Sequence, residues 1–473
     1  MYSLLFLALS SFTLSLILTP FVRNRALRFG LVDQPEPLRK FHKLPTPRLG
    51  GVAILAATLG AYLLLSIMSL TAGHIVRSGI PFAVRLLPAV IVIFGVGLVD
   101  DIVGVVAWQK LVAQVVAAIL AWSSGIHLGA LGGHPFPPVL SFVLTIIWIV
   151  ACANALNLID GVDGLATGIA VFATITTLIA AILHHNIDLA VATVPLAGAL
   201  LGFLRFNFNP ASIFLGDCGS LTVGFLLGCY GIVWSEKSTT LFGMTAPLLA
   251  LSVPLLDAGL AVVRRFLCQQ PIFGADRSHI HHKLLSLGMA PRKVVFVLYG
   301  FCGLAAAASL LLTTTHEQYH SFVIVIVCLG AWLSLQHLGY SEFSVAGKMA
   351  AGGAFRGLLN AQIILLKFER ELSTSNTIQE CSDILCLACP QFGFSGVELC
   401  LDCVVDRKDS TEGWRVRIDF PGHGYINLLR EHGATSPGAA GILFVDCVSH
   451  TFVLKLKELN TGQPEMGFYA NAD

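Results

Sequence analysis

The chain carries little charge for its length. Asp, Glu, Lys and Arg make up 12% of its 473 residues, and its mean hydropathy is +0.78. Soluble domains carry about 25% charged residues, so a wholly soluble protein is excluded. The deficit is uneven, because residues 345–473 hold 26 of the 57 charged side chains. We therefore predict a membrane domain over residues 1–340 and a soluble domain over residues 345–473.

Two further absences exclude a DNA-binding protein and a cleaved signal peptide. No run of Lys and Arg and no zinc-finger spacing indicates DNA binding, so we expect no nucleic-acid partner. The first apolar run, from Tyr2 to Pro20, lacks the basic region and the cleavage site of a signal peptide. We interpret it as the first membrane helix.

Long apolar runs are abundant. A membrane helix needs about 20 apolar residues, and eleven such runs predict an all-α polytopic membrane protein with about eleven transmembrane helices. They cover residues 2–21, 50–70, 84–99, 109–125, 138–156, 165–184, 189–206, 219–235, 242–263, 294–313 and 320–338.

Basic residues alternate between two sets of loops. One set holds only Arg77, Arg85 and Lys237, and the other holds fifteen Lys and Arg. The positive-inside rule makes the second set cytoplasmic, which puts the N-terminus outside and the soluble domain inside. The fifteen are Arg23, Arg25, Arg28, Arg39, Lys40, Lys43, Arg48, Lys110, Arg205, Arg264, Arg265, Arg277, Lys283, Arg292 and Lys293.

Four polar islands interrupt the apolar sequence, and all four fall in the cytoplasmic loops. A charge at the bilayer centre costs roughly 2.5–3.5 kcal/mol, so such clustering indicates a site. Its carboxylates and imidazoles are typical of groups that bind divalent metals and phosphate. The islands cover residues 99–101, 154–164, 214–220 and 276–282.

The first two islands are rich in carboxylates. Asp100 and Asp101 repel each other, which favours a cation between them, and Lys110 begins the next helix; a solvated helix end is the alternative. In the second island Asn154, Asn157, Asp160 and Asp163 recur every third residue and would share a helix face, although a turn between two spans also explains its glycines.

The third and fourth islands favour phosphate. Glycines and free amides around Asp217 open the eighth span, and a helix N-terminus binds anions. Asp217 is either a Mg²⁺ ligand beside that phosphate or the helix N-cap. Arg277 and the histidines 279, 281 and 282 are phosphate or metal ligands. The basic loop before Gly50, with Lys43, is either a topology signal or a docking site for a lipid phosphate.

These motifs, in this order, resemble the polyprenyl-phosphate N-acetylhexosamine-1-phosphate transferase family. The likeness covers residues 1–340, and the pattern His-Ile-His-His from His279 resembles the undecaprenyl-phosphate GlcNAc-1-phosphate transferase branch. It implies a bacterial inner-membrane enzyme with a cytoplasmic active site. Such an enzyme transfers a sugar-1-phosphate, here most simply GlcNAc-1-phosphate, from a UDP-N-acetylhexosamine to a polyprenyl phosphate, releases UMP and initiates a lipid-linked envelope glycan.

The resemblance also implies a set of site residues. Asp217 would hold Mg²⁺ (or Mn²⁺) with Asn157 close to it, and Asp100 would act as a base or orient the lipid phosphate. The catalytic candidates are Asp100, Asp101, Asp160, Asp163, His279, His281 and His282, and the substrate-binding candidates are Lys43, Lys110, Asn154, Asn157 and Arg277.

Other interpretations stay open. A UDP-MurNAc-pentapeptide phosphotransferase belongs to the same family. A secondary transporter would place its polar groups near the midplane in related halves, and a non-catalytic receptor would signal through the soluble domain. A homodimer is also left open by the sequence.

The soluble domain is predicted to have an α+β fold, with a faint resemblance to a GAF domain. We predict helices near 355–373 and 377–391 and strands at 395–405, 414–420, 440–447 and 450–457. Its pairs Cys386/Cys389 and Cys400/Cys403 either bind zinc or serve packing, and a cytoplasmic location predicts no stable disulfide.

Overall fold

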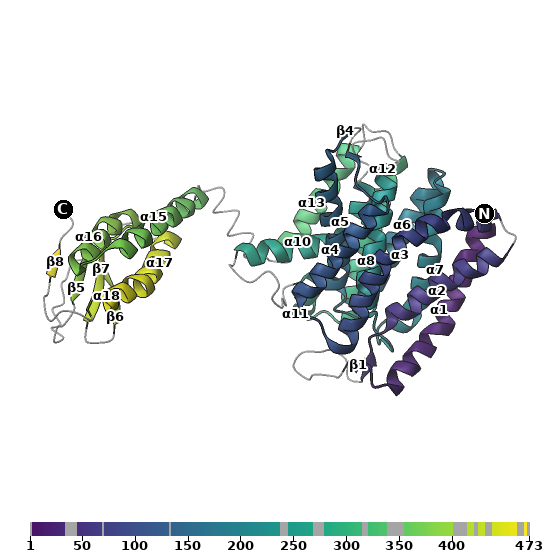
Figure 1. Ribbon diagram of the computed structural model, residues 1–473, viewed down its shortest axis with the longest axis horizontal. Coiled ribbons are helices and arrows are strands. Elements are labelled where there is room, and N and C mark those ends of the chain that lie inside the picture. The colour runs from purple at the N-terminus through teal and green to yellow at the C-terminus, as the bar shows by residue number, and fades with distance from the viewer. Residues whose placement is uncertain are drawn as a thin grey trace. The chain divides into compact units, whose positions relative to one another are not determined.

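The structure is a computed structural model that divides into two compact units, Met1–Tyr340 and Ser341–Asp473. Each unit is described by itself (Figure 1). The residues that the structure describes are 2–33, 45–68, 71–131, 134–236, 245–267, 279–314, 320–337, 354–400, 414–420, 424–430, 438–460 and 468–470.

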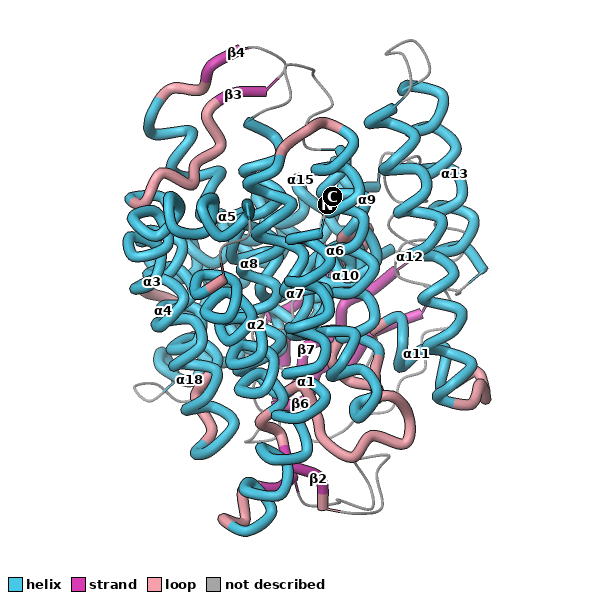
Figure 2. Tube along the Cα trace, turned by 90° about the vertical axis from the view of Figure 1, so that its right-hand side faces the viewer, coloured by secondary structure: helices cyan, strands magenta, loops and turns pink. Residues whose placement is uncertain are grey.

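The first unit is a bundle of helices with a short antiparallel hairpin at each end (Figures 1 and 2). The hairpin of β1 (Val32–Asp33) and β2 (Thr46–Pro47) lies at the same end as helix α11, and that of β3 (Ala130–Leu131) and β4 (His134–Pro135) at the other. The helices are α1 (Tyr2–Arg28), α2 (Gly50–Ile67), α3 (Thr71–Val103), α4 (Ala107–Ser123), α5 (Pro138–Ile159), α6 (Leu165–Leu183), α7 (Ile187–Asn207), α8 (Gly216–Glu236), α9 (Thr245–Ala250), α10 (Ser252–Leu267), α11 (Ile280–Ser286), α12 (Pro291–Thr314) and α13 (His320–His337).

The described residues of each predicted span lie mostly on helix. Eight helices among the described residues are long and apolar enough to cross a membrane. The fold is therefore that of a polytopic membrane protein. The prediction of one unbroken span over 242–263 is wrong, because α9 and α10 abut at Leu251. Pro254 has no amide hydrogen to donate to the carbonyl of Ala250 four residues earlier, which ends α9 there.

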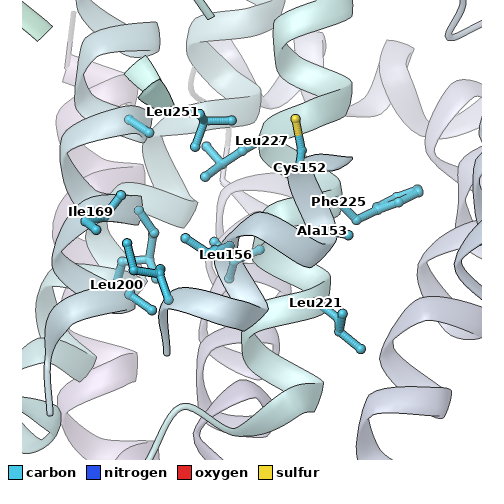
Figure 3. Packing of buried hydrophobic residues seen from close by; sticks show 14 of the residues in the cluster. Cys152, Ala153, Leu156, Ile169, Leu200, Leu221, Phe225, Leu227 and Leu251 are labelled. Atoms are coloured by element: carbon cyan, nitrogen blue, oxygen red, sulfur yellow. The ribbon is translucent and has the colours of Figure 1, made fainter. Parts of the chain in front are cut away.

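Helix α8 is the innermost. Within its most apolar window 83% of the residues are buried, compared with 22% for α1 and 17% for α3. It packs against α5 and α3, and side chains of α5 to α8 meet in the core around Leu156, Ile169, Leu200 and Phe225 (Figure 3). The outer helices keep apolar side chains exposed, as a lipid-facing surface requires.

Helix α7 continues through a proline inside this core. Pro195 cannot donate to the carbonyl of Val191, and the Tyr62 hydroxyl donates to that carbonyl oxygen at 3.1 Å. Tyr230 donates to the neighbouring carbonyl oxygen of Ala192 at 3.0 Å. Neighbouring helices thus satisfy the freed backbone groups, as an apolar surrounding demands.

The second unit combines helices with an antiparallel sheet of order β6-β7-β5-β8. Val397 pairs with Leu428, and Ile418 with Ile426. Alternate residues of the strands pack against the helices around the buried ring of Phe444. The elements are α15 (Ala354–Thr374), α16 (Ile378–Ala388), a 3-10 helix (Cys389–Phe392), β5 (Gly396–Cys400), β6 (Trp414–Phe420), β7 (Gly424–Arg430), α17 (Gly438–Cys447), a π-helical turn (Val448–Phe452), α18 (Val453–Asn460) and β8 (Phe468–Ala470).

Two strand predictions in this unit are wrong. Residues 440–447 and 450–457 are mostly helical, whereas strand β7 was not predicted. The buried residues Phe444, Val448, Phe452 and Leu456 recur every fourth position, which is the period of a helix face. Their aromatic and β-branched side chains had favoured a strand.

The cysteines differ from expectation as well. Cys386 and Cys389 are free, and Cys389 is buried. Cys400 is disulfide-bonded, so the prediction of no disulfide, which rested on compartment alone, is wrong. Cys403 lies outside the described residues.

Candidate active site

Glycines bring three helices together at the N-terminus of α8. A Cβ on Gly97 of α3 would lie 2.6 Å from the Cys218 Cα, and one on Gly51 of α2 would lie 2.3 Å from the Gly219 amide nitrogen. Real Cβ atoms do not approach so closely, so only glycine allows these backbones to meet. The contact places the end of α3, with its two carboxylates, beside the first turn of α8.

Asp101 caps α8 from a different helix. Its Oδ1 accepts a hydrogen bond from the Asp217 amide at 2.8 Å, and its Oδ2 accepts one from the Cys218 amide at 2.9 Å. The prediction of a phosphate cradle is wrong for these two amides, because a carboxylate of the chain already satisfies them. Asp217 is the second residue of α8 and therefore not its N-cap.

Lys110 bridges two carboxylates that lie far apart in sequence. Its Nζ is 2.6 Å from Asp100 Oδ2 and 2.7 Å from Asp217 Oδ2. The Val105 amide donates to the other oxygen of Asp100 at 2.6 Å. Lys110, which the sequence places at the start of the helix after the acidic pair, thus contacts Asp100 and also Asp217.

The second island does not form one helix face. Helix α5 ends at Ile159, so the four polar residues diverge. Asn154 exchanges hydrogen bonds with the buried amide of Gln114 on α4. The side-chain Nδ2 of Asn157 donates to the Ser220 hydroxyl on α8 at 2.9 Å. The Asn157 side chain therefore lies against the same helix that carries Asp217.

Asp160 and Asp163 lie in the turn after α5. Asp163 Oδ2 accepts hydrogen bonds from the Asn209 side chain at 3.0 Å and from the Ala211 amide at 2.9 Å. Burial, followed by repulsion from Asp217 and Asp101, raises the pKa of Asp160 well above its usual value. Both carboxylates are held beside the loop between α7 and α8.

The histidines of the fourth island lie on and before α11. Asp257 of α10 lies 3.0 Å from His279 Nδ1 and accepts from the Ile280 amide at 2.8 Å. His281 is 1% exposed. Burial and the neighbouring His282 lower its pKa to about 3, so the ring is neutral.

These segments surround a pocket of about 400 Å³. Among the predicted site residues, Asp101, Asp160, Asp163, Asp217 and His282 line it. Lys43 and Arg277 lie outside the described residues. The full lining is Asp33, Arg48, Asp101, Asp160, Gly161, Val162, Asp163, Asn207, Asn209, Phe214, Gly216, Asp217, His282, Leu285 and Pro291.

Sequence reasoning did not single out several of these residues. Asp33, which contacts the Arg48 guanidinium, and Asn209 carried no signal of their own. Asp257 did carry one, because it is the single charged residue in the run 242–263, and an ionisable side chain inside a membrane span indicates function by default.

The fold and this site define a polytopic membrane enzyme in which helix ends gather carboxylates, a lysine and histidines, the groups that phosphoryl transfer uses. Known proteins agree. The sequence profile of glycosyl transferase family 4 matches residues 83–235. A probable undecaprenyl-phosphate N-acetylglucosaminyl 1-phosphate transferase of Bacillus subtilis is 35% identical over 290 residues, which cover 60% of this chain and 78% of the relative.

Two further relatives extend the match. A decaprenyl-phosphate N-acetylglucosaminephosphotransferase of Mycobacterium tuberculosis is 35% identical over 312 residues, 60% of this chain and 76% of the relative. A phospho-N-acetylmuramoyl-pentapeptide-transferase of Streptococcus mutans is 30% identical over 250 residues, 49% and 72% respectively. The chain belongs to the polyprenyl-phosphate N-acetylhexosamine-1-phosphate transferases of glycosyl transferase family 4, which confirms the resemblance seen in the sequence.

Proposed function

We propose that this enzyme transfers GlcNAc-1-phosphate from UDP-GlcNAc to a polyprenyl phosphate in the bacterial inner membrane, with its site at the cytoplasmic face. The single observation that carries the proposal is the pocket. Four separate segments of the membrane unit supply carboxylates to one cavity, and a fifth, helix α11, supplies the imidazole of His282. Relatives of the GlcNAc branch match more of the chain than the pentapeptide transferase does, which favours GlcNAc as the sugar.

In the reaction an oxygen of the polyprenyl phosphate attacks the β-phosphorus of the UDP-sugar. The bond between that phosphorus and the bridging oxygen breaks, and UMP leaves with the bond's electron pair. The sugar-1-phosphate is now joined to the lipid phosphate, which gives a polyprenyl diphosphate sugar. Such a transfer depends on charge neutralisation and in-line positioning more than on covalent help.

The residues of the pocket fit Mg²⁺. Five carboxylates line it, whereas Arg48 is the one cationic side chain among its described lining residues. Burial raises the pKa of Asp160 most, and repulsion from the neighbouring carboxylates Asp217 and Asp101 raises it further. Carboxylate and amide oxygens are the ligands of Mg²⁺. Among the described residues, no three His, Cys, Asp or Glu side chains are clustered closely enough to hold an ion without other ligands. Asp217 and the side-chain oxygen of Asn157 would hold the ion, which neutralises the diphosphate when bound.

The chain's own cations complete the neutralisation. Lys110 forms ion pairs with Asp100 and Asp217, so one cation offsets part of the negative charge of these carboxylates beside the substrate phosphates. Because both oxygens of Asp100 accept hydrogen bonds, we assign it to orienting rather than to taking a proton. A phosphate monoester has a second pKa of about 6 and needs no strong base at neutral pH.

The test uses the full chain in phospholipid vesicles with polyprenyl phosphate and UDP-[¹⁴C]GlcNAc. We expect a labelled lipid and one UMP released for each label transferred. UDP-MurNAc-pentapeptide and UDP-GalNAc serve as matched donors, and UDP-GlcNAc should be used at least tenfold faster. Faster use of either other donor would contradict the sugar assignment, and absence of transfer from every donor would contradict the function.

A further inference from the structure

Two histidines of the same motif have opposite surroundings. His279 is 5% exposed, and its Nδ1 lies 3.0 Å from Oδ2 of Asp257, which is itself 2% exposed. A carboxylate can only accept, so Nδ1 carries the proton. The other oxygen of Asp257 accepts from the Ile280 amide. One buried carboxylate on α10 therefore fixes both the His279 ring and the first turn of α11.

His281 has the reverse character. It is 1% exposed, and neither of its ring nitrogens has a hydrogen-bond partner among the described residues. A Cβ on Gly161, a lining residue of the pocket, would lie 2.5 Å from His281 Nε2. A buried polar group without a partner is costly, and this one is kept against the wall of the site.

The two rings are mechanically connected. His279 stacks on His281 with centroids 5.7 Å apart and planes 5° apart. His281 in turn contacts His282 at 4.3 Å between centroids, and His282 lines the pocket. Any rotation of His279 away from Asp257 would therefore displace the ring beside Gly161.

We propose that Asp257 is a positioning residue that acts through His279. It holds the stacked rings of His279 and His281 against Gly161 and thereby places His282, the histidine that lines the pocket, for contact with the substrate phosphates. The proposal rests on the transferase function for the identity of that substrate. It divides the motif into a structural imidazole, used through Nδ1, and a substrate-facing one.

Two substitutions at His279 separate these roles. Asn keeps a donor near the place of Nδ1, whereas Ala removes it. We expect His279→Ala to lower kcat about 10²-fold, as a small misplacement of a reacting group does, with little change in KM. His279→Asn should retain kcat within about threefold of the wild type. Equal loss in both variants would overturn the proposal, since His279 would then act through its other nitrogen.

A double substitution tests whether Asp257 acts through His279. The Asp257→Asn/His279→Ala variant should lose no more kcat than His279→Ala alone, and losses that multiply would contradict a shared pathway. Val263→Ala, an exposed position on the same helix, is the matched control and should keep wild-type kcat.

A chemical readout keeps this test independent of the transferase assignment. We would measure the rate at which diethyl pyrocarbonate modifies His281 in the purified full chain, by mass spectrometry. Asp257→Asn should raise that rate at least tenfold, and an unchanged rate in a folded variant would overturn the proposal. Should Asp257→Asn fail to fold, His279→Ala gives the same readout. A wild type that is inactive with every UDP-sugar would instead reject the proposed function and leave the modification result standing.

Discussion

The two units bury polar groups in different ways. In the membrane unit, partly or fully buried charged groups are joined between helices: Lys110 joins Asp100 to Asp217, and Asp257 joins α10 to α11. The second unit has an aromatic core in which Phe444 stacks on Phe392, with ring centroids 4.4 Å apart. Because charge inside an apolar span is costly, the polar residues of the first unit identify its chemistry. In the second unit no such contrast marks a site.

Substitution of Asp217, in the membrane unit, should have the largest effect on transfer of the changes considered. We expect Asp217→Ala to lower kcat at least 10³-fold even with saturating Mg²⁺, because charge stabilisation dominates this class of reaction. Asp188→Ala is the matched control, since Asp188 is an exposed carboxylate in the first turn of α7. UMP release measures both. Near-normal turnover of Asp217→Ala would show that the metal assignment is wrong.

A substitution in the core of the second unit should have the opposite effect: lower stability of that unit with little change in transfer. Phe444 is fully buried, and Phe→Ala in a core costs about 3–5 kcal/mol. Pulse proteolysis of the full chain should report earlier unfolding of residues 354–460 in Phe444→Ala. Transfer should stay within twofold, because every lining residue of the pocket belongs to the first unit. Leu387→Ala, at an exposed position, should change neither quantity. If Phe444→Ala also lost transfer activity, the two units would not be independent in function, which would contradict this prediction.

Loss of the cap on α8 should be milder. Hydrogen bonds to charged groups contribute about 1.5–3 kcal/mol, so Asp101→Ala should destabilise the membrane unit by about 2–3 kcal/mol. Asp101→Asn keeps one acceptor oxygen, so its stability should lie between those of the wild type and Asp101→Ala. Thermal unfolding in detergent checks the order. If Asp101→Ala unfolds at the wild-type temperature while losing activity, Asp101 has a direct chemical role rather than a capping one.

The smallest predicted effect is a loss of folding stability at acidic pH. His281 has a folded pKa of about 3 against an ordinary value of 6.5, so below pH 6.5 the unfolded chain binds a proton that the folded chain refuses. Stability should therefore fall as pH falls through this window, by about 2 kcal/mol at pH 5. His281→Asn should flatten this part of the pH–stability curve. An equal acid slope in the variant would place the ring in a more solvated site.

Most of the membrane fold was predictable because span length and apolar composition are set by the bilayer. The break between α9 and α10 was not, since it needed the proline at 254 to be weighed against a continuous apolar run. Islands far apart in sequence were expected on one face, and Lys110, Asp101 and Asp217 indeed meet. Which oxygen meets which amide depends on how closely α3 and α8 pack, and sequence alone does not give that.

The second unit was predicted less well for a different reason. Its apolar runs are short, and short apolar runs fit a helix or a strand equally. The run from Phe444 to Leu456 is resolved only by its fourth-residue burial in the packed unit. Asp257, in turn, was missed because the surrounding run was treated as span and its one charge was not questioned.

The central claim is that the end of α8 that carries Asp217 and helix α11, which carries His282, share one pocket on one side of the membrane. Single cysteines at the exposed positions Arg205 and Ser286, in a chain otherwise free of cysteine, can be labelled with a membrane-impermeant maleimide in right-side-out and inverted vesicles. We predict that both react only in inverted vesicles. Reaction of the two positions from opposite sides would contradict the account.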